Sequence, residues 1–399
     1  MLSPMVRYSK MPFRLLARKW GADLAFTPMI IAEGFNRSSH ARDSEFTSNA
    51  CQLFVCDCVV DKPLIVQFAT NSPIELGLAA EKIVGYAQGV DLNCGCPQKW
   101  AIKDGIGGAL SSQPQLVLCL FQRSQVKEMV AETHGRVGSA LTVSIKIRIR
   151  PDMRDTVDLV RKAEAAGVSW ITVHGRTVHE QHDPVHTDCI KLVKDVARVP
   201  IIANGDLFTE TDLESVVKAT NVDGVMSARG ALANPAMFAG YDRIPLQCIV
   251  DYLQLAMEYG GLFETHHHHL SYMLFGFVSK PERREFSLLR SMSGVIDFFR
   301  QRGWWTSETM KSPFTTSPYM HRLPLYHAGA ASSIGPFSLL TDVGFSSASD
   351  SDSKVPSGQT VATLLANDPD LTRMWNPHPG ELAAVKTQKK KKRRKRGRA

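Results

Sequence analysis

Short apolar segments alternate with longer amphipathic stretches that contain Ala, Lys and Glu, from the start of the chain to about residue 240. This alternation is typical of repeated βα units, which build a parallel sheet. Eight apolar segments predict strands, and they lie at 2–5, 24–27, 64–68, 90–93, 142–147, 170–173, 200–203 and 224–227. Eight such units predict an α/β fold, the (β/α)8 TIM barrel, over residues 1–240.

The segments between these strands predict helices, with candidates at 12–20, 73–84, 115–132, 156–166, 189–197 and 210–219. The first strand is short, because only three residues precede Pro4 and Met5. Strands commonly contain about five residues. We therefore expect the first strand to be incomplete.

Two further segments, 245–259 and 270–302, predict helices, so we expect a small all-α domain over residues 241–302. Acidic and basic residues balance across this domain, and an RNA-binding face there would require the fold to separate them. The histidine run 266–269 precedes the second helix and is expected on the surface of this domain rather than at a metal.

The last part of the chain, residues 303–399, is rich in Ser, Pro, Thr and Gly without a period. This composition predicts a mostly disordered tail. The chain has a net charge of +8, but residues 389–399 carry nine positive charges and no acid, so residues 1–388 have a net charge of −1. The polybasic end could be a nuclear address, a non-specific polyanion-binding arm, or a solvated charge run.

No apolar run reaches the roughly 18–20 residues that a membrane helix needs. We expect no membrane partner, a cytoplasmic or nuclear location, and a monomer. The eight cysteines form no CxxC pair, and the spacing of Cys51, Cys56 and Cys58 matches no zinc or iron–sulfur pattern. We therefore predict no metal, and we interpret the segment 48–61 as an apolar surface insertion.

Cys94 and Cys96 lie in the segment Asp-Leu-Asn-Cys-Gly-Cys-Pro at 91–97, where an apolar strand changes to a tight loop. Such a loop presents a thiol at the end of the fourth predicted strand. In a TIM barrel the active site forms just past the carboxyl ends of the strands. The residues at these ends are Pro4, Met5, Gln67, Asn93, Cys94, Cys96, Lys146, Arg148, His174, Arg176, Asn204, Gly205, Asp206, Ala228 and Arg229.

The ends of strands seven and eight predict a phosphate site. A glycine loop at Asn204-Gly205-Asp206 and an arginine loop at Ala228-Arg229 each precede a helix, which is how TIM barrels commonly hold phosphate. Either loop alone is an ordinary turn signal, so the argument depends on both lying at matched strand ends.

Lys146 lies within an apolar strand, where a cation needs an anionic partner. A reduced flavin ring would supply one, with Gln67 bonded to its amide edge and His174 nearby. Alone, His174 would more often be a core histidine, but its position beside Lys146 and the two loops favours a functional role.

Several segments together resemble the FMN-dependent tRNA-dihydrouridine synthase family, and their amino-acid sequences are most similar to its eukaryotic Dus4-like branch. They are PMVRYSKMPFR, LIVQF, DLNCGCPQ followed by DGIGGAL, SIKIRIR, VSWITVHGRT, VPIIANGD and GVMSARGALANP, and the resemblance covers roughly residues 2 to 300. The segment 48–61, Ser111-Ser112 and the residues after about 302 depart from the family pattern.

The resemblance implies reduction of the C5=C6 bond of a uridine in tRNA. NADPH would reduce bound FMN, flavin N5 would give hydride to C6, and Cys96 would protonate C5 from the opposite face. A thiol is largely protonated at neutral pH and suits this role. The flavin ligands implied are Pro4, Met5, Val6, Gln67, Lys146, His174, Asn204, Gly205, Asp206, Ala228 and Arg229.

For the substrate, the resemblance implies that Asn93 bonds the uracil edge and that His174 and Arg176 contact uracil or its phosphate. The uridine would leave its stack to reach the mouth, and the helical domain would hold the tRNA. Lys99, Lys103 and Arg150 are candidate phosphate contacts at the rim, or plain surface charges. Cys94 is the rival to Cys96 as proton donor.

Two other functions stay open at this point. One is an FMN barrel oxidoreductase that acts on a free pyrimidine. The other is a catalytically inactive variant that binds tRNA, suggested by the short first strand and the foreign tail.

Overall fold

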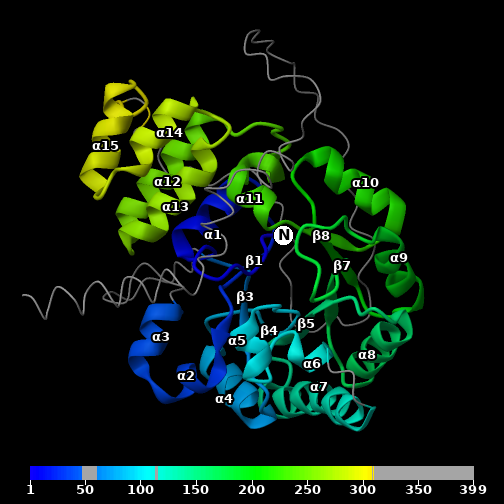
Figure 1. Ribbon diagram of the computed structural model, residues 1–399. Helices are drawn as coiled ribbons and strands as arrows, with labels where there is room; N and C mark the ends of the chain where they lie inside the picture. The colour runs from blue at the N-terminus through cyan, green and yellow to red at the C-terminus, as the bar shows by residue number, and fades with distance from the viewer. Residues whose placement is uncertain (47–60, 113–115, 308, 310–399) are drawn as a thin grey trace, which may run out of the picture. The chain divides into compact units, whose positions relative to one another are not determined.

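The computed structural model describes residues 1–46, 61–112, 116–307 and 309. The predicted surface insertion lies outside these residues except for its last position, and so does the predicted disordered tail beyond residue 309. The described part holds one parallel sheet, the helices around it and a group of helices at its C-terminal end (Figure 1).

The sheet is parallel throughout and follows the chain order that a TIM barrel requires. Its path runs through β1 (Ala25–Phe26), β3 (Leu64–Ala69), β4 (Gly89–Cys94), β5 (Thr142–Arg148), β6 (Trp170–His174), β7 (Ile201–Asn204) and β8 (Gly224–Met226), and β2 (Ile30–Ile31) pairs with β3 off this path. Seven of the eight predicted strands are therefore confirmed as strands of one sheet.

The remaining predicted strand, at the start of the chain, is reduced to a single bridging residue. Leu2 pairs in parallel with both Ala25 and Ser227, which lie at the two edges of the sheet. The Leu2 amide donates to the Leu24 carbonyl at 2.8 Å, and the Ser227 amide donates to the Met1 carbonyl at 3.1 Å. These bonds close the sheet into a barrel, so the short first strand still fulfils its role in the fold.

Long helices cover the outside of the sheet (Figure 1), and the predicted ones are confirmed within a few residues of their bounds. They are α1 (Met11–Lys19), α4 (Pro73–Ile83), α7 (Leu116–Val137), α8 (Met153–Ala165), α9 (Thr187–Val196) and α10 (Glu210–Thr220). Capping residues explain several starts: the Ser72 hydroxyl accepts the Glu75 amide at α4, and Thr209 and Asp212 form a capping box at α10.

The interior of the barrel and the space beneath the helices form two apolar layers. Phe26, Ile65, Ile202 and Met226 cluster inside the sheet, whereas the larger core lies between the sheet and its helices. Short elements that sequence periodicity does not reveal connect these parts. They are α2 (Ala32–Arg37), α3 (Ser39–Glu45), α5 (Lys99–Lys103), α6 (Ala109–Ser112), α11 (Arg229–Ala233) and the 3-10 turn η1 (Pro235–Ala239).

The C-terminal helices belong to the same compact unit as the barrel. They are α12 (Leu246–Tyr259), α13 (Phe263–Leu274), α14 (Lys280–Ser287) and α15 (Met292–Gln301). The first predicted helix is confirmed as α12, but the predicted helix 270–302 is wrong as one element, because turns divide it into three. The separate domain boundary at residue 241 stays a prediction.

The prediction of a surface histidine run is wrong. Residues 266–269 lie within α13, and His266, His267 and His269 are buried, with His269 fully enclosed. The His269 ring stacks on Phe13 at 4.3 Å and its Nε2 contacts the Tyr8 carbonyl at 2.8 Å. Burial lowers the pKa of each of these rings, so they pack as neutral aromatic groups in the helical core.

Candidate active site at the barrel mouth

Strand register places the polar residues of β4 to β7 in a row at the carboxyl ends of the strands. Asn93 pairs with Lys146 across β4 and β5, and Arg148 pairs with His174 across β5 and β6. His174 in turn pairs with Asn204 on β7. The structure therefore brings these predicted site residues together at one mouth.

The loop after β4 holds Cys96 half-buried at this mouth. The Asn93 side-chain oxygen accepts the Cys96 amide at 2.9 Å, and the Gly108 amide donates to the Cys96 carbonyl at 2.9 Å. A Cβ atom on Gly107 would stand 2.7 Å from that of Cys96, so only glycine allows the following loop to pack this closely.

Burial raises the pKa of the Cys96 thiol, although the cations Arg148 and Lys146 act in the opposite direction. The thiol is therefore protonated at neutral pH. Cys94 is fully buried in the core between sheet and helices, and burial raises the pKa of its thiol further. A reacting group at the mouth can reach Cys96, whereas Cys94 is enclosed.

Lys146 projects from β5 and donates from Nζ to the Asn204 side-chain oxygen at 2.8 Å. The Asn204 amide nitrogen donates to the Met226 carbonyl at 2.7 Å, which fixes the orientation of the Asn204 side chain. Burial and the neighbouring Arg148 lower the pKa of Lys146 to about 8, and Asp91 and Cys96 act to raise it. An anion at the mouth would raise the pKa of Lys146 and so favour its positively charged form.

His174 is neutral at this mouth. Burial lowers its pKa well below the usual range, and the charges of Lys146, Arg148, Arg176 and Arg229 lower it further. Arg176 Nη1 lies 3.4 Å from His174 Nε2. A guanidinium can only donate, so Nε2 accepts and Nδ1 carries the proton.

The two predicted phosphate loops meet at Asp206. Its carboxylate accepts Arg229 at 2.8 Å and also accepts Arg176. Gly205 has a φ of +125°, and a Cβ atom there would stand 2.9 Å from the His174 ring. Ala228 directly precedes α11, which begins at Arg229. The loops thus form a tight cradle around guanidinium groups.

Pro4, Met5 and Val6 follow the bridging residue Leu2 and so lie at the same end of the barrel. The Met5 amide donates to the Ser9 hydroxyl at 2.9 Å, while Val6 is exposed. On β3, Gln67 is buried and accepts the Asn93 side-chain amide at 2.9 Å.

Two of the three predicted rim cations are on the surface, and one is not. Lys99 and Lys103 are exposed on α5. Arg150 is buried, and its guanidinium lies 3.9 Å from the Asp155 carboxylate. Arg150 is therefore not a plain surface charge, and its contact to phosphate stays a prediction.

Two charged side chains at the mouth have roles that the sequence did not reveal. Arg148 donates to the carbonyls of Thr177 and Glu180 at 2.8 and 3.1 Å, which ties the loop after β6 to β5. Asp91 is a fully buried carboxylate on β4. The sequence signal that could have found both residues is the one that identified Lys146, namely a charged residue within an apolar strand.

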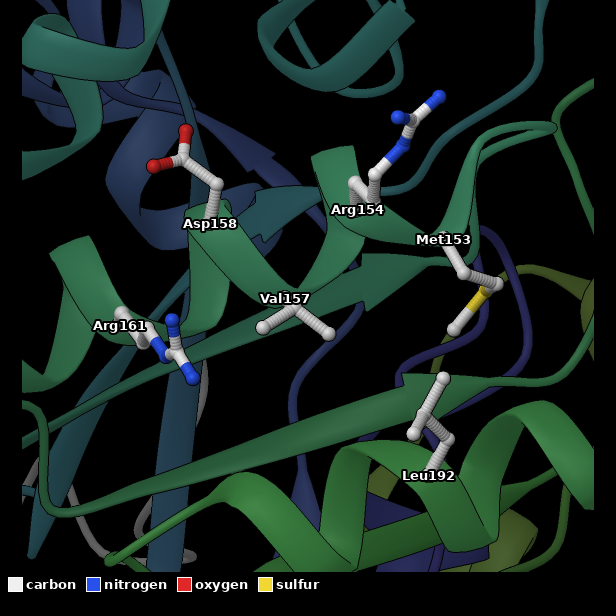
Figure 2. A pocket seen from close by; sticks show the side chains of 6 residues that line it. All are labelled: Met153, Arg154, Val157, Asp158, Arg161 and Leu192. Carbon is white, nitrogen blue, oxygen red and sulfur yellow. The ribbon is translucent and has the colours of Figure 1, made fainter.

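A shallow pocket also lies outside the barrel, between α8 and α9 (Figure 2). It is lined by Met153, Arg154, Val157, Asp158, Arg161 and Leu192. Within the described ranges, no group of three or more His, Cys, Asp or Glu is arranged to hold a metal. Among the described helices, none combines the length and apolarity that a membrane span needs.

The closed parallel barrel and the polar mouth at its strand ends define an enzyme of the TIM-barrel class. The family model for dihydrouridine synthase matches residues 1–298. The chain therefore belongs to the dihydrouridine synthase family.

Named relatives agree with this family. The chain is 52% identical over 297 residues to a tRNA-dihydrouridine(20a/20b) synthase-like protein of Mus musculus, covering 74% of this chain and 86% of the relative. It is 51% identical over 296 residues to the Homo sapiens protein of that name, covering 74% and 88%. It is 40% identical over 307 residues to tRNA-dihydrouridine(20a/20b) synthase of Saccharomyces cerevisiae, covering 76% and 77%.

Proposed function

We propose that this chain is an FMN-dependent tRNA-dihydrouridine synthase that reduces the C5=C6 bond of a uridine in tRNA. The observation that carries the proposal is the half-buried, protonated Cys96 at a mouth that also holds Lys146 and neutral His174. The names of the three relatives support NADPH or NADH as reductant and uridines 20a and 20b as targets.

The residues present fit FMN. Lys146, Arg148 and Arg229 lie at the mouth, and Asp206 is the carboxylate that pairs with Arg229 there. A cationic surplus of this kind suits a phosphate and a ring that becomes anionic on reduction. At Gly205 a Cβ atom would strike His174, so glycine there lets the His174 ring pack closely against the loop.

FMN supplies the hydride when it is reduced by the nicotinamide donor. Lys146 would hold a positive charge beside the ring, and Gln67 would bond the ring's amide edge. Arg229 would hold the phosphate, with Asp206, Gly205, Asn204 and Ala228 shaping the cradle. Pro4, Met5 and Val6 would border the ring from the loop after Leu2.

Cys96 would donate its proton to C5 of the uracil. Its raised pKa keeps the proton on sulfur until the developing carbanion takes it, and the nearby cations stabilise the thiolate that remains. Asn93 has one side-chain N–H beyond the bond to Gln67, which suits a carbonyl oxygen of the uracil. His174 would contact the base or its phosphate as a neutral ring.

The two predicted substrate contacts Arg176 and Lys99 differ in exposure. Its side chain is 2% exposed and is held by Asp206 and the Asp183 carbonyl, which favours positioning of His174 over direct contact with substrate. Lys99 is exposed on the helix after the Cys96 loop. We propose it as a contact to a tRNA phosphate near the target base.

We propose that the helical part contacts tRNA through exposed arginines. Arg302 pairs with both Glu282 and Glu285, at 3.2 and 2.7 Å. Arg284 and Arg290 are exposed and have no carboxylate partner within the described residues. These two arginines are therefore the candidates for contacts to tRNA phosphates.

The proposal is tested with full-length protein, FMN, NADPH and unmodified tRNA, with dihydrouridine measured by mass spectrometry. Cys96→Ala should retain the flavin and lose about 10²-fold or more in rate. Cys189→Ala, which removes a half-buried thiol on α9, is the matched control and should keep its rate.

Three results would count against the proposal. Protein that takes up no flavin even on reconstitution, while binding tRNA, would favour the inactive RNA-binding alternative. Turnover of free uracil or orotate in place of tRNA would favour the small-molecule alternative. Unchanged activity in Cys96→Ala would assign the proton donor elsewhere.

A further inference from the structure

Asp91 is a carboxylate inside the barrel that the proposed reaction does not use. It lies on β4, is fully buried, and accepts two hydrogen bonds. Gln67 donates from Nε2 at 2.7 Å and Ser144 donates from its hydroxyl at 2.6 Å. A buried carboxylate is costly to maintain, so an arrangement this complete calls for a function.

A series of hydrogen bonds leads from this carboxylate to the reactive loop. Gln67 Nε2 bonds Asp91, and Gln67 Oε1 accepts the Asn93 amide at 2.9 Å. Asn93 Oδ1 then accepts the backbone N–H groups of Gly95 and Cys96, at 3.0 and 2.9 Å. We call this series, from Asp91 through Gln67 and Asn93 to the two backbone amides, the Asp91 relay.

The direction of the Asp91 relay is fixed at both ends. An ionised carboxylate only accepts, and a backbone N–H only donates. Between them, Gln67 and Asn93 each have one orientation that satisfies both neighbours. In that orientation each amide keeps one N–H that the relay does not use.

We propose that Asp91 is a positioning residue, whose carboxylate holds the Cys96 loop in place through Gln67 and Asn93. The Asp91 relay stands on its own geometry, while its meaning for catalysis rests on the function proposed above. Burial raises the pKa of Asp91 to about 6, and the bonds from Gln67 and Ser144 and the charge of Lys146 act to lower it. The carboxylate is therefore ionised at neutral pH.

The Asp91 relay predicts the effects of isosteric substitutions at positions 67 and 91. Gln67→Glu places two carboxylates face to face, where only one can stay ionised, and so disrupts the link to Asn93. Asp91→Asn keeps an acceptor for Gln67 and changes little. The two substitutions together move the carboxylate from position 91 to position 67, where it accepts from the side-chain amides on both sides. Asp91→Asn should therefore rescue Gln67→Glu.

The experiment is hydrogen–deuterium exchange of the full-length protein, followed by mass spectrometry of a peptide that contains residues 93–98. It reads the Gly95 and Cys96 amides directly and needs neither flavin nor tRNA. We expect exchange about tenfold faster in Gln67→Glu, and within about threefold of the unchanged protein in Asp91→Asn and in the double variant. Ser144→Ala, which removes the other donor to Asp91, is the matched control and should leave the loop protected.

The proposal depends on whether Asp91→Asn restores slow amide exchange when it is added to Gln67→Glu. A double variant that exchanges as fast as Gln67→Glu, or faster, would overturn the proposal, as would unchanged protection in Gln67→Glu. If Gln67→Glu alone fails to fold, a folded double variant with a protected loop supports the Asp91 relay, and a double variant that also fails to fold overturns it. If the unchanged protein binds no flavin while its loop is protected, the proposed function fails and the Asp91 relay stands.

Discussion

Two clusters in this protein have the same composition, two arginines around one aspartate, in different surroundings. The Asp61 cluster consists of Arg14, Arg18 and Asp61, and the Asp206 cluster consists of Arg176, Arg229 and Asp206. The first cluster serves the fold, whereas the second is available to a ligand.

The Asp61 cluster is closed. Its three side chains are at most 8% exposed, and Asp61 accepts Arg14 Nε at 2.8 Å and Arg18 Nε at 3.1 Å. Backbone carbonyls of Ser9 and Pro63 take further guanidinium N–H groups. The aspartate and these carbonyls surround the arginines, so the cluster fixes α1 against the start of β3.

The Asp206 cluster is open. Asp206 is 35% exposed and Arg229 is 28% exposed, while Arg176 is 2% exposed. The nearby cations Lys146 and Arg148 add positive charge, and together they hold His174 neutral. Positive charge that the protein does not balance, at a surface that solvent reaches, is the condition for binding an anion. The difference between the clusters therefore supports the proposal that the mouth is the ligand site.

The largest effect should come from removing each aspartate's charge. Asp61→Asn removes the carboxylate that the two buried arginines share and should lower the free energy of unfolding by about 3–5 kcal/mol. Asp206→Asn should cost about 1 kcal/mol, because water reaches the Asp206 cluster. Urea unfolding of the full-length variants measures both. Equal losses would show that the two clusters contribute alike to the fold.

The sequence predicted most of the barrel because its signals are local. Each strand is an apolar run bounded by turn residues, and each long helix repeats its apolar positions with a helical period. The positions of Lys146, His174 and Asn204 followed from the same rule, since parallel strands end at one edge of a barrel. Their place at one mouth is confirmed, and their roles stay predictions.

What the sequence did not predict depends on contacts between distant segments. Periodicity does not show that Leu2 pairs with both sheet edges, or that the His269 ring stacks on Phe13 from α1. A cation is usually solvated, yet Arg150 is buried. The Asp91 relay likewise requires the side-chain positions of β3 and β4, which no local pattern specifies.

The next effect is on the pH dependence of the reaction, which sharpens the description of the mouth. Asp91, with a pKa of about 6, keeps an acceptor oxygen for Gln67 whether or not it is protonated, so its titration alone should leave activity little changed. Lys146, with a pKa of about 8, must be protonated to face an anion, so activity should fall as the pH passes upward through about 8. Cys96 keeps its proton across this range because burial raises its pKa.

The measurement is kcat/KM against pH, where the alkaline limb should fall roughly tenfold per pH unit. Lys146→Arg should move this limb upward, and Asp91→Asn, which removes a charge that raises the pKa of Lys146, should move it downward. The two groups interact, so the limb belongs to the site as a whole. An alkaline limb that stays near the pKa of about 8 in Lys146→Arg would assign it to another group.

The smallest effect is the stabilisation of the flavin-free protein by inorganic phosphate, which tests the Asp206 cluster alone. A ligand that binds only the folded state stabilises it by mass action, by about 1.4 kcal/mol at roughly ten times its dissociation constant. Phosphate at the Asp206 cluster should raise the midpoint of thermal unfolding by roughly 2 °C or more. Chloride at matched ionic strength should not.

Arg229→Ala should abolish most of this phosphate response, because it removes the partly exposed guanidinium of the Asp206 cluster. Arg154→Ala removes the same charge from a side chain that is 92% exposed on α8 and should respond as the unchanged protein does. A response that survives in Arg229→Ala would mean that phosphate acts elsewhere, and the Asp206 cluster would then join the Asp61 cluster as part of the fold.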